Sequence, residues 1–228
     1  TVVKGRNKRP VFDRVHVRLP KGRRIAVLGP RRSGKTTLVN LICGTARIER
    51  GRIWKRGRIS WPLGRPVMTN PNLSMRDIVA FYAHAAGKDL PETIDLVDEI
   101  CMFGSRKTFA LSRMPRYMKA RLDLVLPLIY GFDCYVIDEV VAPHGLSLPP
   151  DRVDLLNAEI KSKDLIFLTS RPNMATQYAD TGAVIEDKTI IFCSSVAEAI
   201  ARAQAAPPGA EFDDEPEGEE DDGADVFS

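Results

Sequence analysis

Hydrophobic and polar residues along this chain follow two different periodicities, which predict alternating strands and helices. Compact apolar or alternating runs predict strands at 11–19, 24–29, 134–137 and 165–169. Apolar residues at helical spacing predict helices at 36–44, 75–86, 91–103, 118–130 and 196–204. A terminal hairpin is expected from 184–185 and 189–193. This order favours an α/β fold with a mostly parallel sheet that is covered on both faces.

The composition excludes several classes of protein. Of the 228 residues, 44% are hydrophobic and 28% are charged, which is the balance of a globular domain. No run approaches the roughly 18 to 20 uninterrupted apolar residues of a membrane span. Fibrous, disordered, disulfide-framed and membrane-spanning proteins are therefore poor matches, and we expect a soluble intracellular protein.

Cysteine and histidine are too scattered to suggest a metal centre. Four cysteines are present, and no two of them form a C-x-x-C pair. The three histidines are isolated as well. This distribution argues against a zinc site and agrees with a reduced cytoplasmic compartment.

The net charge of +3 conceals two opposite blocks. The last 18 residues hold 10 acids and no Lys or Arg, whereas residues 1–60 hold 18 bases and two acids. We expect a disordered acidic tail at 206–228, which either screens the basic front or serves only solubility. The basic front favours an anionic partner: a nucleotide, a nucleic acid or an anionic membrane surface. The stretch 47–63, which largely overlaps this basic block, has glycines between short β-prone pieces.

The segment from Gly29 to Thr36 matches the pattern G-x-x-x-x-G-K-[ST] at every fixed position. It lies between a predicted strand and a predicted helix, which is the context that this pattern requires. Gly29 and Gly34 let backbone N–H groups point at phosphate oxygens, and the helix adds the positive end of its dipole. Lys35 is expected to reach the β- and γ-phosphates, and the Thr36 hydroxyl to bind Mg²⁺. The alternative, a glycine turn that carries a lysine by chance, fits this context poorly.

A second chemical element follows a later buried strand. Asp138 and Glu139 end the apolar run that starts at Cys134. Asp138 is expected to hold the metal, directly or through water, and Glu139 to polarise the attacking water near the γ-phosphate. Two acids that merely cap a strand are the alternative. Together with the phosphate loop, the pair indicates a P-loop ATPase.

Four further stretches carry a resemblance to a known family. The first is the ISWPL sequence at Ile59–Leu63, and the others are Asp77–Tyr82, Met118–Leu122 and Phe132–Val140. Together they resemble the ATP-binding subunits of ABC transporters that export capsular polysaccharide and related surface glycans. The ISWPL sequence is the most specific marker, and the other stretches are shared more widely among ABC proteins. The resemblance extends from about Val11 to Ala203.

The resemblance implies a fold and a set of partners. It implies a P-loop NTPase of the ABC ATPase type, with a mixed sheet, flanking helices and a helical subdomain at about 71–130. The whole ATPase domain would span 1–205. ATP and Mg²⁺ would be the cofactors, and a second cassette, identical or different, would complete the dimer. An integral membrane permease would dock near Asn70–Phe81 and hold the chain as a peripheral protein on the cytoplasmic face of the inner membrane.

The site residues implied by the resemblance fall into three groups. The nucleotide-binding group is the whole phosphate loop: Gly29, Pro30, Arg31, Arg32, Ser33, Gly34, Lys35, Thr36 and Thr37. The metal group is Thr36, Asp138 and Asn70, where Asn70 stands in place of the family's Q-loop glutamine. The catalytic group is Glu139 and Arg171, where Arg171 replaces the family's switch histidine.

Other positions depart from the family pattern. Arg116 and Tyr117 stand where the family has Ser-Gly in its signature motif, whose glycine lets one subunit approach the γ-phosphate held by the other. The D-loop region Ala142–Gly145 has no aspartate, and no aromatic residue near Val2 or Val3 can stack on adenine. Arg31 and Arg32 either add positive charge at the phosphates or point to solvent. The half of the site that grips the nucleotide is therefore intact, and the half donated across a dimer is altered.

Three functions remain open at the level of sequence. The first is a transport ATPase that drives a glycan-exporting permease. The second is a degenerate cassette that binds nucleotide, hydrolyses it slowly and assists or regulates a competent partner. The third is a non-transport nucleotide-binding protein associated with nucleic acid, motivated by the basic first 60 residues, although no recognition helix or aromatic platform is evident. A permease gene beside this one would favour the first two.

Overall fold

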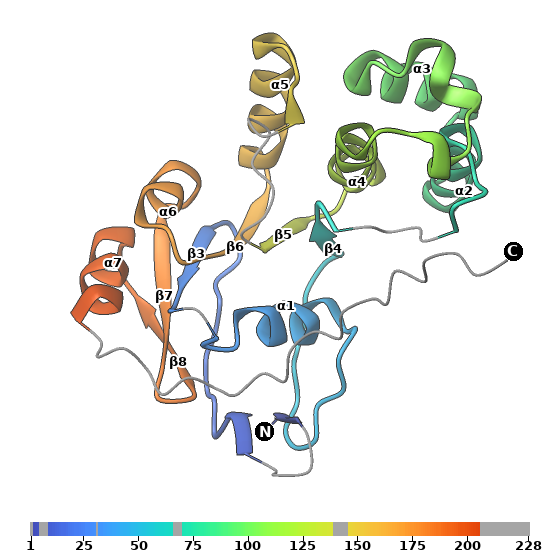
Figure 1. Ribbon diagram of the computed structural model, residues 1–228. Helices are drawn as coiled ribbons and strands as arrows, with labels where there is room; N and C mark the ends of the chain where they lie inside the picture. Colours follow the sequence, from blue (N-terminus) through green and yellow to red (C-terminus); the bar gives the residue numbers. More distant parts are fainter. Residues whose placement is uncertain (1, 5–8, 31, 66–69, 139–145, 206–228) are drawn as a thin grey trace, which may run out of the picture.

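The computed structural model describes most of the chain, namely residues 2–4, 9–30, 32–65, 70–138 and 146–205. Figure 1 shows an α/β body built around a twisted sheet, with a layer of helices beside the β4 edge of that sheet. Within the described ranges no helix has both the length and the apolar character that a membrane crossing requires.

Among the described residues, the strands form one six-stranded sheet and one small hairpin. The large sheet has the order β4-β5-β6-β3-β7-β8, in which neighbours are parallel except for the antiparallel pair β7–β8. Its strands are β3 (Arg24–Leu28), β4 (Ile59–Leu63), β5 (Cys134–Asp138), β6 (Asp164–Thr169), β7 (Thr181–Glu186) and β8 (Thr189–Cys193). The hairpin pairs β1 (Val2–Lys4) with β2 (Arg9–Phe12).

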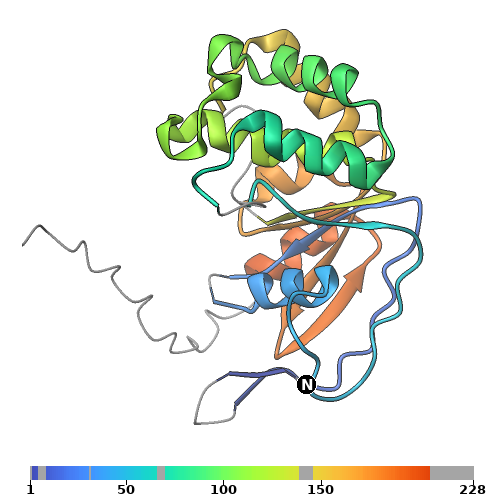
Figure 2. The same ribbon diagram turned by 90° about the vertical axis from the view of Figure 1, so that its right-hand side faces the viewer.

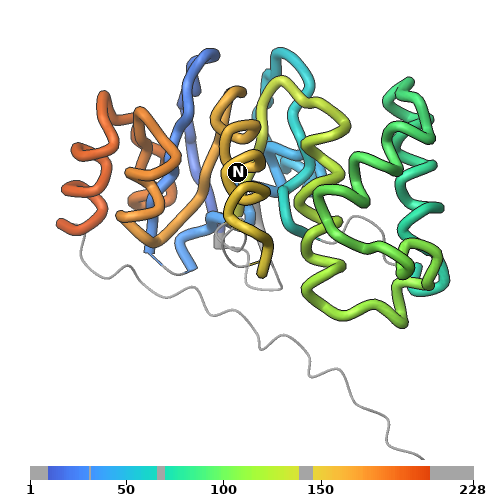
Figure 3. The backbone as a smooth tube through the Cα atoms, turned by 90° about the horizontal axis from the view of Figure 1, so that it is seen from above, coloured from blue at the N-terminus to red at the C-terminus, as the bar shows by residue number. Residues whose placement is uncertain are grey.

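Helices cover both faces of the large sheet, as its apolar strands require. In β3, Ile25 and Val27 pack in the cluster that contains α1 (Lys35–Cys43), whereas Ala26 and Leu28 pack toward the opposite face. That face is covered by α5 (Pro150–Lys161), α6 (Pro172–Tyr178) and α7 (Val196–Ala205). Figure 1 shows α5 and α6 above the strands and α1 below them, and Figure 3, which looks from above, shows α5 in front of α1.

The helical layer packs around its own apolar core. It consists of α2 (Met75–Ala86), α3 (Leu90–Cys101), the 3-10 turns η1 (Gly104–Thr108) and η2 (Leu111–Arg113), and α4 (Arg116–Tyr130). Its fully buried side chains include Met75, Val79, Val97 and Leu124, all in one hydrophobic cluster that also reaches β5 and β6. Figure 2 shows this layer stacked above the sheet, at the end of the molecule opposite the N-terminus.

Local signals start and end the helices of this layer. At the start of α2, the Ser74 hydroxyl accepts from the Asp77 backbone N–H, and the Asp77 carboxylate accepts from the Ser74 N–H, which is a capping box. Gly87 ends the same helix with φ +66. Asp89 caps α3 by accepting from the Glu92 N–H. These caps explain why the predicted 75–86 and 91–103 helices agree closely with the observed ones.

Three regions differ from the sequence-based expectation. The strand predicted at 11–19 ends at Phe12, because Arg14 has φ +50 and breaks the extended backbone. Val15, Val17 and Leu19 still pack against the α1 core without a strand partner. In the basic stretch, only Ile59–Leu63 forms a strand. Helices α5 and α6 were not predicted at all.

Candidate functional site

The phosphate loop connects a central strand to the helix that follows it. Strand β3 lies between β6 and β7, and the chain passes from its last residue, Leu28, through Gly29 to the start of α1 at Lys35. The N-terminus of α1 therefore lies at the carboxyl edge of the sheet, which is where α/β proteins bind ligands. Arg31 lies outside the described residues.

Both fixed glycines of the loop are required, for different reasons. A Cβ on Gly29 would stand 2.5 Å from Ser33 Oγ, because the Ser33 side chain folds across this position. Gly34 has φ +95 and caps α1, and a Cβ there would stand 2.7 Å from Val11 Cγ1. A larger residue at either position would push the loop out of its curl.

Lys35 folds back over the loop and closes it. Its Nζ donates to the carbonyl oxygens of Gly29 at 2.8 Å and Pro30 at 2.7 Å, and the residue is only 7% exposed. A nearly buried ammonium needs anionic or carbonyl partners, because it has left water. The loop thus holds a positive charge inside its own curve.

Two other loop side chains have distinct environments. Ser33 Oγ is buried and has no hydrogen-bond partner among the described residues, so it is a polar atom that a ligand could satisfy. Arg32 is exposed and has φ +64, so the structure places its residue on the solvent side of the loop. The added positive charge that Arg32 would bring to bound phosphates stays a prediction.

Strand β5 brings Asp138 to the loop. Asp138 is 6% exposed, and its Oδ2 accepts a hydrogen bond of 3.3 Å from Thr36 Oγ1 on the first turn of α1. The two residues are 102 positions apart in sequence, and they meet because β5 and β3 both end at this edge. This is the pair that the sequence predicted for the metal.

Arg65 pairs with the Asp138 carboxylate, and the sequence analysis did not identify it as a site residue. Its Nη2 donates to Asp138 Oδ2, and its Nη1 donates to Asn40 Oδ1 at 3.4 Å. A partial signal was present, because Arg65 lies two residues past the stretch 47–63, in which the sequence shows short β-prone pieces but predicts no definite strand. The structure forms strand β4 there, parallel to β5, so Arg65 and Asp138 reach the same edge of the sheet.

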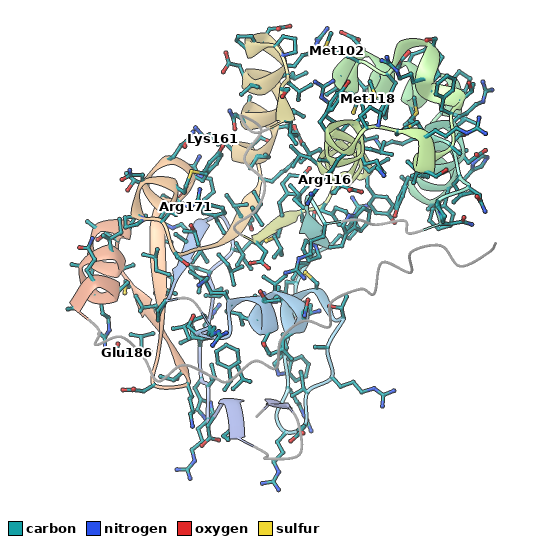
Figure 4. All side chains as sticks on the ribbon, viewed as in Figure 1. Met102, Arg116, Met118, Lys161, Arg171 and Glu186 are labelled. Carbon is teal, nitrogen blue, oxygen red and sulfur yellow. The ribbon has the colours of Figure 1, made fainter. Side chains whose placement is uncertain are left out.

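The other predicted site residues lie around this centre. Arg171 follows β6, the strand between β5 and β3, and its backbone N–H donates to Thr169 Oγ1 at 3.0 Å. Its side chain is exposed, and Figure 4 places it near the start of α6. Asn70 is exposed too, and its Oδ1 accepts from the Asn72 N–H at 3.0 Å within a local turn. No hydrogen bond joins Asn70 to Thr36 or Asp138 in the part of the chain described. Glu139 lies outside that part.

The altered signature residues open helix α4. Pro115 is the N-cap, and Arg116 and Tyr117 form the first turn, where both are exposed. Tyr117 is 42% exposed, and the centroid of its ring lies 4.9 Å from the guanidinium carbon of Arg121. Figure 4 shows Arg116 at the base of the helical layer, near β4. The D-loop region 142–145 lies outside the described residues.

The Cys43 thiol lies close enough to Arg65 and Asp138 to feel their charges. Burial raises the pKa of Cys43 to about 11, against the opposing charges of Lys55 and Arg65. Its Sγ lies 3.3 Å from the carbonyl oxygen of Ser60, so it packs between α1 and β4. A thiol with so high a pKa is neither a nucleophile nor a metal ligand at neutral pH.

The residues present fit a magnesium nucleotide. The glycine curl leaves room that a Cβ would fill, Lys35 supplies a buried cation, and Ser33 supplies a polar atom without a partner. One hydroxyl and one carboxylate meet where the metal of a P-loop site would be held. Hard oxygen ligands of this kind suit Mg²⁺, which takes its other ligands from phosphates and water.

Known proteins match the chain in sequence over most of its length. The family described as ABC transporter matches residues 12–96. The capsule polysaccharide export ATP-binding protein CtrD of Neisseria meningitidis serogroup B is 31% identical over 78% of this chain and 82% of its own length. The polysialic acid transport ATP-binding protein KpsT of Escherichia coli is 29% identical over 84% of this chain and 89% of its own length. The ATP-binding protein BexA of Haemophilus influenzae is 28% identical over 78% and 82%.

A solved structure matches the fold. A structure described as the ATP-binding subunit of an ABC transporter superimposes with a TM-score of 0.67, over 85% of this chain and 93% of the other. The two sequences are 17% identical, so this likeness concerns the fold alone. It agrees with the ABC ATPase fold expected from the sequence.

Proposed function

Since the chain belongs to the ATP-binding subunits of ABC transporters for capsular polysaccharide and related surface glycan export, we propose that it binds ATP–Mg²⁺ and powers a membrane permease. The permease would export capsular or related surface polysaccharide across the inner membrane. The relatives' names refer to capsule polysaccharide and polysialic acid, and the particular glycan of this chain is left unassigned.

One observation carries the proposal. The buried Lys35 ammonium closes the phosphate loop beside the contact between Thr36 and Asp138, at the carboxyl edge of the sheet. When a nucleotide binds, its phosphates offer Lys35 stronger partners than the two carbonyls, because a phosphate oxygen carries a net negative charge where a carbonyl offers only a dipole. The loop N–H groups and the α1 dipole would hold the same phosphates.

The remaining residues would act on the γ-phosphate. Thr36, Asp138 and Asn70 would hold Mg²⁺, which when bound neutralises the charge that develops on the phosphate oxygens. Glu139 would accept a proton from the attacking water, because it follows the metal-binding Asp138. Arg171 would contact the γ-phosphate as a permanent cation, which cannot take part in proton handling as a histidine does.

Two partners follow from family membership. A second cassette, a copy of this chain or a related one, would supply the other half of each ATP site. The permease would dock at Asn70–Phe81, and Phe81 on α2 is 56% exposed, as a docking residue must be. The chain would then be held at the cytoplasmic face of the inner membrane through the permease. Fractionation should release it from the membrane pellet when the permease is deleted.

Titration calorimetry with ATP and Mg²⁺ tests the proposed binding. Lys35→Ala should weaken ATP binding roughly 100-fold, because the phosphates lose a charged partner inside a nearly buried site. Lys88→Ala removes an exposed lysine just after α2 and serves as the charge-matched control. Unchanged ATP affinity in the Lys35 variant would refute the proposal.

A further inference from the structure

Arg65 reaches the candidate metal position because of how two neighbouring strands end. Strands β4 and β5 are parallel, with Leu63 opposite Ile137, so the residues that follow each strand lie at the same edge. Gly64 has φ +76, and the Arg65 N–H donates to the Pro62 carbonyl at 3.4 Å, which makes a tight turn. That turn directs the Arg65 side chain back over the end of β5.

The Arg65 guanidinium connects the end of β5 to helix α1. Nη2 donates to Asp138 Oδ2, and Nη1 donates to Asn40 Oδ1 at 3.4 Å. Thr36 Oγ1 donates to the same carboxylate oxygen at 3.3 Å. Thr36 and Asn40 are one turn apart on α1, so Arg65 lies along the helix face that looks at β5. Asp138 Oδ2, the oxygen expected to bind the metal, therefore already accepts hydrogen bonds from the Arg65 guanidinium and the Thr36 hydroxyl.

The Arg65–Asp138 ion pair involves a carboxylate that is nearly buried. The Asp138 side chain is 7% exposed and the Arg65 side chain 38% exposed. A carboxylate with so little access to water needs a counter-charge, and in the absence of a metal Arg65 provides it. Mg²⁺ on the same oxygen would stand within a few ångströms of the guanidinium, where two positive charges repel.

We propose that Arg65 is a resident counter-ion of Asp138 that competes with Mg²⁺ and partly replaces it. This inference rests on the proposed binding of ATP–Mg²⁺ at this site. Its consequence is twofold. The chain needs more Mg²⁺ than the same site without the arginine, and it keeps more of its nucleotide affinity when Mg²⁺ is absent. When Mg²⁺ binds Asp138, the Arg65 guanidinium would move away from the carboxylate and keep its hydrogen bond to Asn40.

Binding of a fluorescent ATP analogue, titrated with MgCl₂ and repeated in EDTA, tests this. Arg65→Met removes the charge and the guanidinium but keeps an unbranched apolar stem. It should lower the MgCl₂ midpoint roughly fivefold, because a partly exposed ion pair is worth up to about 1 kcal/mol. In EDTA the same variant should bind the analogue roughly fivefold more weakly, because Asp138 then faces the phosphates without a counter-charge.

The two effects have opposite signs, which separates them from a general loss of structure. A poorly folded variant would bind more weakly under both conditions, and its melting temperature would fall. Arg65→Lys keeps a charge and should lie between the parent and the Met variant. Arg106→Met removes an exposed charge in the helical layer, and it should match the parent in both arms.

The outcomes distinguish this inference from the proposed function. Nucleotide binding by the parent, with equal MgCl₂ midpoints in the parent and the Arg65→Met variant, would overturn the counter-ion role and leave the ATP site standing. A variant that binds more tightly in EDTA would overturn it as well. A parent that binds no nucleotide at any MgCl₂ concentration would instead refute the proposed function, and the inference would fall with it.

Discussion

The phosphate loop and the first turn of α4 are two regions that ABC cassettes bring to one nucleotide from opposite subunits, and here they differ. The loop keeps every fixed residue, a Cβ at either fixed glycine would meet a neighbouring side chain, and Lys35 donates to two carbonyl oxygens of the loop. The first turn of α4 presents exposed Arg116 and Tyr117 in place of Ser-Gly. We therefore propose that this chain separates nucleotide binding from hydrolysis, so that the isolated chain binds ATP firmly and turns it over slowly.

Glu139→Gln gives the largest expected effect, and it separates hydrolysis from nucleotide binding within one subunit. Turnover should fall roughly 1,000-fold, because a positioned general base contributes about that much. ATP affinity should stay the same, because the carboxylate orients water and does not hold the nucleotide. Phosphate release and titration calorimetry measure the two quantities. Glu92→Gln, an exposed charge-matched change on α3, is the control. Equal turnover in the variant and the parent would remove Glu139 from the mechanism.

Arg121→Met tests whether buried hydrogen bonds anchor helix α4, whose first turn carries the altered signature residues. Arg121 is 6% exposed and donates to the carbonyl oxygens of Cys101, Leu146 and Ser147. Leaving two buried carbonyls and one partly buried carbonyl without a donor should lower the free energy of unfolding by roughly 3 kcal/mol. Urea denaturation measures this, with exposed Arg113→Met as the control. A loss no larger than the control's would mean that these contacts do not anchor α4.

Ser74→Ala tests the start of the expected permease-docking helix. Loss of the capping box should lower the free energy of unfolding by about 1 kcal/mol. The comparison is exposed Ser105→Ala, again by urea denaturation. If the two serine variants are equally stable, the cap contributes nothing measurable to α2.

The Ser74 variant also has a pH signature. The hydrogen bonds from the Ser74 hydroxyl and backbone lower the pKa of Asp77 in the folded chain. A lowered folded-state pKa adds stability that is complete above the unfolded-state pKa and is lost as pH falls through the folded-state value. The deficit of the variant should accordingly be full at neutral pH and shrink in acid. A deficit that grows on acidification would have the wrong sign.

Arg171→His gives the smallest expected effect. Restoring the residue type that the family uses as its switch should raise turnover roughly threefold, because one exposed charge is worth less than about 1 kcal/mol. Steady-state phosphate release measures the change. Arg152→His on α5 provides a control of the same chemistry away from the γ-phosphate. A slower Arg171→His variant would show that the arginine has taken over the role.

Sequence alone predicted the regions where local signals agree with the fold. The β3 run, the glycine loop and the apolar face of α1 follow one another within 20 residues, so motif and periodicity support each other. The terminal hairpin predicted at 184–185 and 189–193 was confirmed as β7 and β8, because two apolar runs lie close together in the sequence. The weakly amphipathic α5 was missed, because its first residues, Pro150 and Asp151, read as a loop.

Contacts between distant residues set the limit of sequence reasoning at the site. Thr36 and Asp138 were predicted to cooperate because a motif joins them, and the structure brings them into contact. Arg65 belongs to no motif, and its contact with Asp138 spans 73 residues. That contact depends on β4 lying beside β5 in a particular register, which no pattern in the chain encodes on its own.

Turnover of the double variant Arg116→Ser with Tyr117→Gly tests the central claim most directly. Parent and variant should bind ATP with the same affinity, because the first turn of α4 does not grip the nucleotide of its own subunit. The variant should hydrolyse ATP roughly tenfold faster or more, because backbone and hydroxyl donors return to the γ-phosphate, where charge develops. A parent that already turns over as fast as the variant would contradict the account, and Arg116 and Tyr117 would then have taken over the signature's role.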